Sequence, residues 1–337
     1  METTKKIITA LELPFAYSHP TDKIKTIITA VSVIFLTGDY AYKINKPLDL
    51  GFLDFSTLEK RKEQCEKELQ HNSLITPELY ESVVEITEDE EKIAVEGKGE
   101  VIEYALKMRQ VDPDKTMNLL LEKDQVNQEH IHKLAQKIFD FHQIALSNEE
   151  IKNYGSIETI EFNWKENFEQ TEKYKPELIA EKDFSFIKKK IDCFIEDNTE
   201  LFAQRIEKNQ IKHCHGDFHS ANVFIIGDEI YIFDAIVFNK RFPNCDIISE
   251  IAFMAMDLDF NGKKEFSGIF IDRYRELSGD DDIPKLLNFY KCYRAYIRGK
   301  IACFTSEDKN LDEEQLKETK DMAKKYFSLS KKYASFL

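Results

Sequence analysis

Histidine, aspartate and cysteine side chains crowd into residues 213–225, which read HCHGDFHSANVFI. His213, His215, Asp217 and His219 recur at every second position and would share one face of an extended segment, so a zinc-dependent hydrolase is one hypothesis. The last histidine, however, comes one residue too late for the pattern His-x-His-x-Asp-His, and a one-residue shift turns a side chain to the opposite face. No histidine follows His219, and the remaining acids and cysteines lack zinc-like spacing. A multi-histidine metal site is therefore the weaker interpretation.

Asp217 and Asn222 offer a second chemistry, since four residues separate the acid from the amide. A carboxylate can accept the proton of an attacking hydroxyl, and a nearby amide oxygen can hold a Mg²⁺ ion that bridges nucleotide phosphates. Phosphotransferases of the kinase type carry this pair at this separation. Asp234 closes the apolar run IYIFD, where a charge is costly without a partner such as a metal, although a turn residue is the alternative for Asp234 alone. We predict Asp217 as the base and Asn222 and Asp234 as metal ligands.

Such chemistry also requires a lysine on an early strand, paired with a glutamate on the following helix. The run Tyr40-Ala41-Tyr42-Lys43 has the form of that strand, which makes Lys43 the predicted phosphate-contacting residue. Lys46 is the competitor, but it stands beside Pro47 at the end of the strand. The helix offers Glu66 and Glu68 as partners. We favour Glu68, while an exposed helix face remains the default interpretation of either glutamate alone.

The elements that must position these residues are strand-rich up to about residue 110. Two β-rich runs, 31–36 and 40–45, flank Thr37-Gly38-Asp39 and predict a hairpin. Ser56 and Glu59 stand at capping-box spacing, which predicts a helix from Thr57 to about Ser73. Further short strands are predicted at 80–87, 92–96 and 101–108.

The second part of the chain is mostly helical in pattern. Apolar residues recur at helical spacing over 126–146, and similar patterns fill 157–209 and the region after Cys245. One strand–turn–strand, 222–226 and 229–234, interrupts them. These patterns predict an α+β, bilobal, protein-kinase-like fold with a nucleotide-binding lobe over 1–110 and a catalytic and substrate-binding lobe over 111–337.

Composition limits the partners of the protein. The 337 residues carry a formal net charge of −15 and a pI of about 5.1, which disfavours binding to the phosphate backbone of nucleic acids. The six cysteines have no regular pairing and suggest a reducing compartment. Neither a signal-peptide pattern nor a membrane-length apolar run is present, so a cytoplasmic protein without a membrane partner is expected.

With these residues assembled, the sequence resembles the aminoglycoside phosphotransferase and choline-kinase-like family. The resemblance rests on His215-Gly216-Asp217-x-His219-x-x-Asn222 followed by Phe233-Asp234, and it extends over nearly the whole chain. It is stronger toward a bacterial branch of aminoglycoside-phosphotransferase-like enzymes, through the segments 35–61, 215–223, 233–242 and 293–300.

The resemblance implies a bilobal fold that binds ATP or GTP between its lobes together with Mg²⁺. It also implies roles by position: Asp217 as base, Asn222 and Asp234 on metal, Lys43 on phosphates, a hinge near 107–111 that brings Met108 to the nucleotide, and Asp246 as the anchor of the catalytic loop through backbone amides. His215 is expected to support the loop from behind. His219 could line the site or be a buried, hydrogen-bonded histidine.

The sequence is compatible with two kinds of acceptor and with two functions. Asp257 and Asp259 could bind a cationic acceptor, whereas Arg294 and Arg298, one helical turn apart, could bind an anionic one. No Ser, Thr or Tyr lies between Asp234 and Asp246, so an activation-loop phosphosite is excluded there and a small-molecule kinase is favoured. The alternative is a nucleotide-binding pseudokinase or regulatory module without turnover.

Overall fold

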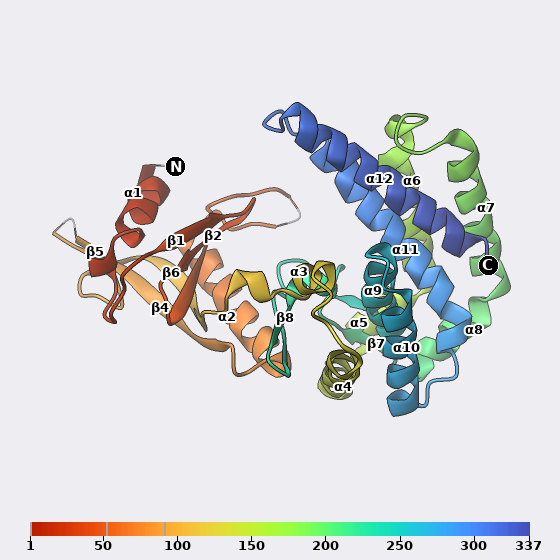
Figure 1. The fold of residues 1–337 in the computed structure, drawn as a ribbon, viewed down its shortest axis with the longest axis horizontal. Coiled ribbons are helices and arrows are strands. Elements are labelled where there is room, and N and C mark those ends of the chain that lie inside the picture. The colour runs from red at the N-terminus through yellow and green to blue at the C-terminus, as the bar shows by residue number, and fades with distance from the viewer. Residues whose placement is uncertain (1, 52, 91) are drawn as a thin grey trace. The chain divides into compact units, whose positions relative to one another are not determined.

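The computed structural model describes residues 2–51, 53–90 and 92–337, which form two compact units (Figure 1). The first unit contains Met1–Thr116 and Asn222–Lys240, and the second contains Met117–Ala221 and Arg241–Leu337. The sequence-based division assigns everything after residue 110 to one lobe. The structure instead groups the segment Asn222–Lys240 with the N-terminal part of the chain, because its hairpin is held there by the contacts described below.

An antiparallel sheet of six strands forms the centre of the first unit, in the order β1-β2-β3-β6-β4-β5. Alternation along β3 places Tyr42 and Ile44 in the core that includes Ile7 and Leu11 of helix α1 (Glu2–Leu11), and turns Lys43 to the opposite face. The predicted strands over β2 to β6 are confirmed, whereas α1 and β1 were not predicted. The strands are β1 (Lys25–Ile28), β2 (Ser32–Leu36), β3 (Tyr40–Asn45), β4 (Tyr80–Asp89), β5 (Lys92–Val95) and β6 (Glu100–Arg109).

Helix α2 (Leu58–Ile75) covers the face of the sheet that carries Lys43. The Thr57 side chain accepts the amide of Lys60 and caps the helix, so the predicted cap at Ser56 is wrong by one residue. Near the start of α2, Arg61 donates from Nε to both carboxylate oxygens of Glu103 on β6, at 2.9 and 2.8 Å. This buried pair fixes the register of the helix on the sheet.

The second unit is mostly helical, as predicted, with a short antiparallel ribbon of β7 (Ile211–His213) and β10 (Asn244–Asp246). Helix α9 is buried from Ile247 to Leu258, and most of these residues are apolar. Helices α11 and α12 lie side by side (Figure 1). The helices are α3 (Met117–Glu122), α4 (Gln128–Ile144), α5 (Glu149–Lys152), α6 (Ile157–Thr171), α7 (Glu181–Asp197), α8 (Thr199–Glu207), α9 (Ile247–Phe260), α10 (Lys264–Ser278), α11 (Ile283–Thr305) and α12 (Glu313–Ala334). Among the described residues, no helix combines the length and the apolar character needed to span a membrane.

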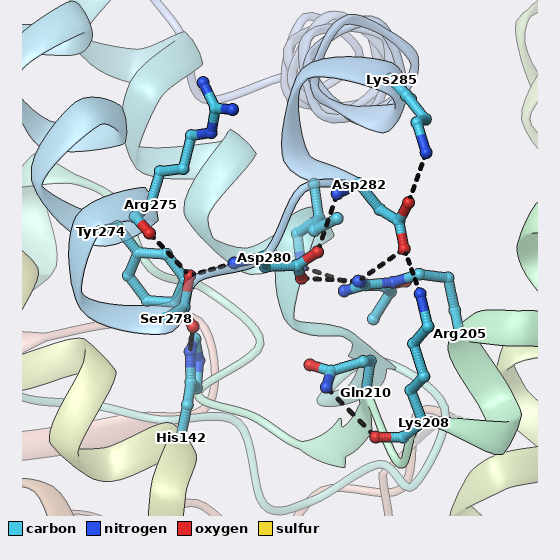
Figure 2. Close-up of polar contacts among 12 residues, drawn as sticks. His142, Arg205, Lys208, Gln210, Tyr274, Arg275, Ser278, Asp280, Asp282 and Lys285 are labelled. Carbon is cyan, nitrogen blue, oxygen red and sulfur yellow. Dashed lines mark hydrogen bonds and ion pairs between the residues drawn. The ribbon is translucent and has the colours of Figure 1, made fainter.

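Arg205 of α8 is the centre of a buried ionic group in the second unit (Figure 2). Its guanidinium donates two 2.8 Å hydrogen bonds to Asp246 and one of 2.5 Å to Asp280. The Asp246 carboxylate also accepts the amide of Ile248 and caps α9. The expectation that Asp246 anchors the catalytic loop through backbone amides is therefore wrong, since Asp246 instead fixes the start of α9.

Glu250, one turn into α9, performs that anchoring. Its carboxylate accepts the amides of His215 and Gly216, at 3.1 and 2.8 Å. A third hydrogen bond, of 2.8 Å, joins it to Nε2 of His142 on α4, and Nδ1 of His142 lies 2.6 Å from the hydroxyl of Tyr274 (Figure 2). Burial alone would raise the pKa of Glu250, but His142 and the amides lower it to about 2, so the group is a buried carboxylate.

Replacing Arg205 is expected to test the ionic group. Arg205→Gln should lower the free energy of unfolding by about 3–5 kcal/mol, because it leaves buried carboxylates without their cation. Urea denaturation followed by circular dichroism measures the loss. The matched control is Arg273→Gln, which removes a pair with Glu276 and a 3.4 Å hydrogen bond to Gln136 and should cost less than about 1 kcal/mol. Equal losses in both variants would contradict the role assigned to Arg205.

A second expectation concerns Glu250 and pH. Its pKa is lowered from 4.5 to about 2 in the folded protein, so its stabilising contribution is complete above pH 4.5 and is lost as pH falls toward 2. Glu250→Gln lacks this titration. The stability difference between wild type and Glu250→Gln should therefore narrow by about 2 kcal/mol between pH 6 and pH 3, measured by urea denaturation at each pH. A constant difference would contradict the lowered pKa.

Candidate active site

Lys43 on β3 lies between two carboxylates of the first unit. Its Nζ is 2.5 Å from Glu68 Oε1 and 2.7 Å from Asp234 Oδ1. Glu66, the other glutamate considered as partner, is exposed and lies 3.9 Å from Lys62. The geometry thus joins three of the residues singled out from the sequence, which come from β3, α2 and the segment after β9 (Glu229–Ile232).

Lys43 and the two carboxylates shift one another's pKa values. Burial by itself lowers the pKa of Lys43, but the carboxylates of Asp234 and Glu68 outweigh it and raise that pKa well above its ordinary value. Burial raises the pKa of Glu68, and the ammonium of Lys43 partly offsets that effect. Lys43 is therefore a permanent cation, fixed at the point where α2 approaches the sheet.

Asp234 follows β9 in a left-handed backbone conformation, with φ of +63°. Aspartate tolerates this region better than most residues, but the conformation still requires support. The hydroxyl of Tyr80 accepts the amide of Asp234 at 3.0 Å, and Oδ1 of Asn72 accepts the amide of Ala235 at 2.9 Å. These two buried side chains turn the chain sharply, which leaves the Asp234 side chain 53% exposed beside Lys43.

Asn222 lies at the same end of the hairpin as Asp234. Strands β8 (Val223–Ile226) and β9 (Glu229–Ile232) pair with Val223 opposite Ile232. The amide of Phe233 then donates to the carbonyl of Asn222 at 3.1 Å, which extends the ladder by one step. Consequently Asn222 directly precedes the hairpin and Asp234 follows it, so two oxygen-bearing side chains flank one end of the same ribbon.

The sheet face that carries Lys43 continues toward β6. Ala41 pairs with Met108, and Lys43 pairs with Leu106. Met108 is partly buried and packs with an apolar group that includes Tyr80 and Phe233. At the rim, Gln110 receives the amide of Gly38 (φ +106°) on its side chain, which ties the β2–β3 turn to the end of β6. Met108 thus stands on the sheet face that also bears the ammonium of Lys43.

Asp217 belongs to the second unit, in the loop between β7 and Ala221. The loop turns at Gly216, whose φ of +85° is unfavourable for other residues, and Glu250 holds the amide of this glycine. The carbonyl of Gly216 accepts a hydrogen bond from Arg294 Nη1 at 3.3 Å. Both polar groups of Gly216 are thus satisfied by buried side chains, and the position of Asp217 along the loop is fixed.

His219 orients the Asp217 carboxylate. Its Nδ1 accepts the amide of Ala221 at 3.3 Å, so the proton is on Nε2, which lies 3.3 Å from Asp217 Oδ2. Burial alone would raise the pKa of Asp217, but His219 and the charge of Arg298 hold it well below its ordinary value. Asp217, with a side chain 36% exposed, is therefore a partly exposed, ionised carboxylate.

The histidines of the opening motif are committed to hydrogen bonds. His215 is fully buried and accepts the amide of Asp217 on Nδ1, and Nδ1 of His213 lies 2.8 Å from Asn244 Oδ1. In the described part of the chain, the group that could hold a metal through histidine or cysteine is His142, Cys214 and Glu250. Both ring nitrogens of His142 are already hydrogen-bonded there. The geometry therefore speaks against a histidine-based zinc centre.

Sequence reasoning missed the residues that hold the two acids in place. Asn72 and Tyr80 support Asp234, and Glu250 with His142 supports the loop before Asp217. Polar residues inside otherwise apolar patterns were the available signal: Glu250 interrupts IISEIAFM, and Asn72 precedes the apolar end of α2. Their partners lie far away in sequence, so the pattern alone could not name them.

The sequence and the fold were compared with those of known proteins. No protein-family model matches the sequence. Uncharacterized proteins of Mycobacterium tuberculosis and Mycobacterium bovis are 27% identical over 275 residues, which cover 82% of this chain and 54% of each relative. The chain thus spans about half the length of these relatives.

Solved structures match over most of the chain. Choline kinase from Cryptosporidium parvum covers 100% of this chain and 96% of its own, with 12% identity and a TM-score of 0.60. Ethanolamine kinase from Plasmodium vivax covers 91% and 81%, with 14% identity and a TM-score of 0.52. A Ralstonia eutropha protein assigned to the aminoglycoside phosphotransferases covers 99% and 98%, with 12% identity and a TM-score of 0.55. The chain has the protein-kinase-like fold of the choline and ethanolamine kinases and the aminoglycoside phosphotransferases.

Proposed function

We propose that the protein is a Mg²⁺-dependent kinase that transfers the γ-phosphate of ATP or GTP to a hydroxyl group of a small molecule. The observation that carries the proposal is the joining of Lys43, Glu68 and Asp234 at the hairpin end that also bears Asn222. Phosphoryl transfer needs this combination of a fixed cation and oxygen ligands. The shared fold supports a small acceptor, since choline and ethanolamine are small alcohols.

The first unit would bind the nucleotide. Lys43 would contact its phosphates, Glu68 would hold Lys43 in position, and Met108 would pack against the base. Lys43, Glu68 and Asp234 together carry one formal negative charge, which would repel phosphates unless a further cation were bound. Asn222 and Asp234 offer the oxygen donors that suit Mg²⁺, and the ion would neutralise charge on the phosphates.

Asp217 would act as the base. The hydroxyl oxygen of the acceptor would attack the γ-phosphorus while its proton passes to the carboxylate of Asp217. The bond from the γ-phosphorus to the β–γ bridging oxygen would break, and the nucleoside diphosphate would leave with that electron pair. The hydrogen bond from His219 would keep the carboxylate in one orientation.

Asp217→Asn is expected to lower phosphate transfer by about 10²–10⁴-fold, because the amide cannot take the hydroxyl proton. Transfer is measured with γ-labelled ATP and a metabolite extract, and nucleotide affinity by calorimetry. The affinity should stay unchanged. Asp281→Asn, an exposed position, serves as the control. Full activity of Asp217→Asn would overturn the assignment of the base. Nucleotide binding by the wild type without any labelled product would favour the regulatory-module alternative.

Asp234→Asn is expected to abolish the contribution of Mg²⁺ to nucleotide binding. In the wild type, chelation of Mg²⁺ should weaken ATP binding at least tenfold, since the metal joins protein oxygens to phosphates. In Asp234→Asn the affinity should be nearly the same with and without Mg²⁺. Asp228→Asn at the opposite end of the same hairpin is the control, expected to behave as the wild type. Calorimetric titration measures all three proteins. A full Mg²⁺ effect in Asp234→Asn would exclude Asp234 as a ligand.

A further inference from the structure

Arg294 and Arg298 lie one helical turn apart on α11, and their contacts differ. Arg294 is buried and fully engaged: Nη1 donates to the Gly216 carbonyl, and Nε donates to the carbonyl and hydroxyl of Ser249, both at 3.2 Å. Its guanidinium also lies 5.0 Å from the centre of the Phe253 ring. Arg294 is therefore part of the scaffold of the loop, which excludes it as the anion-binding arginine considered from the sequence.

Arg298 lies one helical turn further along the same face of α11 and is only partly buried. Its side chain forms a hydrogen bond with Tyr326, and the charges of Asp217 and Asp257 act on it. Its guanidinium lies 5.7 Å from the centre of the Tyr326 ring, which stacks on Phe260 with 3.9 Å between ring centres. Burial alone would lower the pKa of Arg298, but Tyr326, Asp217 and Asp257 raise it, so the side chain is a cation.

Asp257 and Asp259, by contrast, already have hydrogen-bond partners within the protein. Asp257 is 5% exposed and accepts the amide of Ser220 at 3.0 Å, which holds the end of the loop. Asp259 accepts the Nζ of Lys291 at 2.9 Å and the hydroxyl of Tyr333. The hypothesis that these two carboxylates receive a cationic acceptor therefore conflicts with their contacts.

We propose that Arg298 binds an anionic group, a carboxylate or a phosphate, of the acceptor alcohol, so that the acceptor is an anion. This inference rests on the proposed kinase function. The planar guanidinium can donate two parallel hydrogen bonds to such a group, and the Tyr326–Phe260 stack beneath it restricts its plane. The hydroxyl of the acceptor would then be presented to Asp217, whose charge Arg298 already influences.

The test uses γ-labelled ATP and a metabolite extract separated by charge on ion-exchange resins into anionic, neutral and cationic fractions. The wild type is expected to label a product from the anionic fraction only. Labelled product from the cationic or neutral fraction alone would overturn the anionic acceptor while leaving the kinase function standing. No labelled product from any fraction, with nucleotide bound, would overturn the kinase function and this inference with it.

Arg298→Gln then tests the residue itself. The amount of anionic fraction needed for half-maximal rate should rise about 10–100-fold, as expected for loss of hydrogen bonds to a charged group, while the KM for ATP stays within twofold. Arg298→Lys, which keeps the charge without the planar fork, should be intermediate. Arg273→Gln, a partly exposed position on α10, is the control and should match the wild type. A fall in kcat alone, with the acceptor requirement unchanged, would reduce Arg298 to an electrostatic role on Asp217 and overturn its role in binding.

Discussion

The carboxylate of Glu250 accepting two successive backbone amides is the interaction on which the second unit depends. A buried charge of this kind is stable only when its remaining partners are in place, and here His142 and Tyr274 complete the set. Helices α4, α9 and α10 are thereby joined by one continuous chain of hydrogen bonds. The loop before Asp217 is fixed by the same chain, so its geometry is a property of the helical core more than of the loop sequence.

In the first unit, neutral side chains hold two successive backbone amides in a similar way. Asp234 has a left-handed backbone, which is supported by two acceptors: the Tyr80 hydroxyl accepts the amide of Asp234, and Asn72 Oδ1 accepts the amide of Ala235. In both units a predicted site acid therefore follows or occupies a position of positive φ, and buried side chains hold the backbone there. The strain is local, whereas its support comes from helices and strands far away in sequence.

Whether a feature could be predicted from the sequence depends on how far apart along the chain the interacting residues lie. Short β-rich runs predicted β2, β3, β4, β5 and β6, capping-box spacing predicted α2, and helical spacing predicted α4, because these patterns are local. The spacing of Asp217, Asn222 and Asp234 likewise singled out the candidate chemistry. The cap of α2 fell on Thr57 and not on Ser56, an error within the usual precision of helix ends. The roles of Asp246, Asp257 and Asp259 could not be read from sequence, since each is decided by a partner distant along the chain.

The placement of the hairpin segment Asn222–Lys240 in the first unit has a consequence for how the protein is made. The chain leaves the first unit after Thr116 and returns to it only at Asn222, so neither unit is encoded by one continuous stretch. During synthesis the six-stranded sheet is complete long before the hairpin that supplies Asn222 and Asp234 has left the ribosome. For that interval the nascent sheet and α2 lack their hairpin. The side chains of Asn72, Thr76 and Tyr80 then have no hydrogen bonds to the hairpin backbone, which lies more than a hundred residues downstream. A simple truncation after residue 116 would leave them permanently in that state.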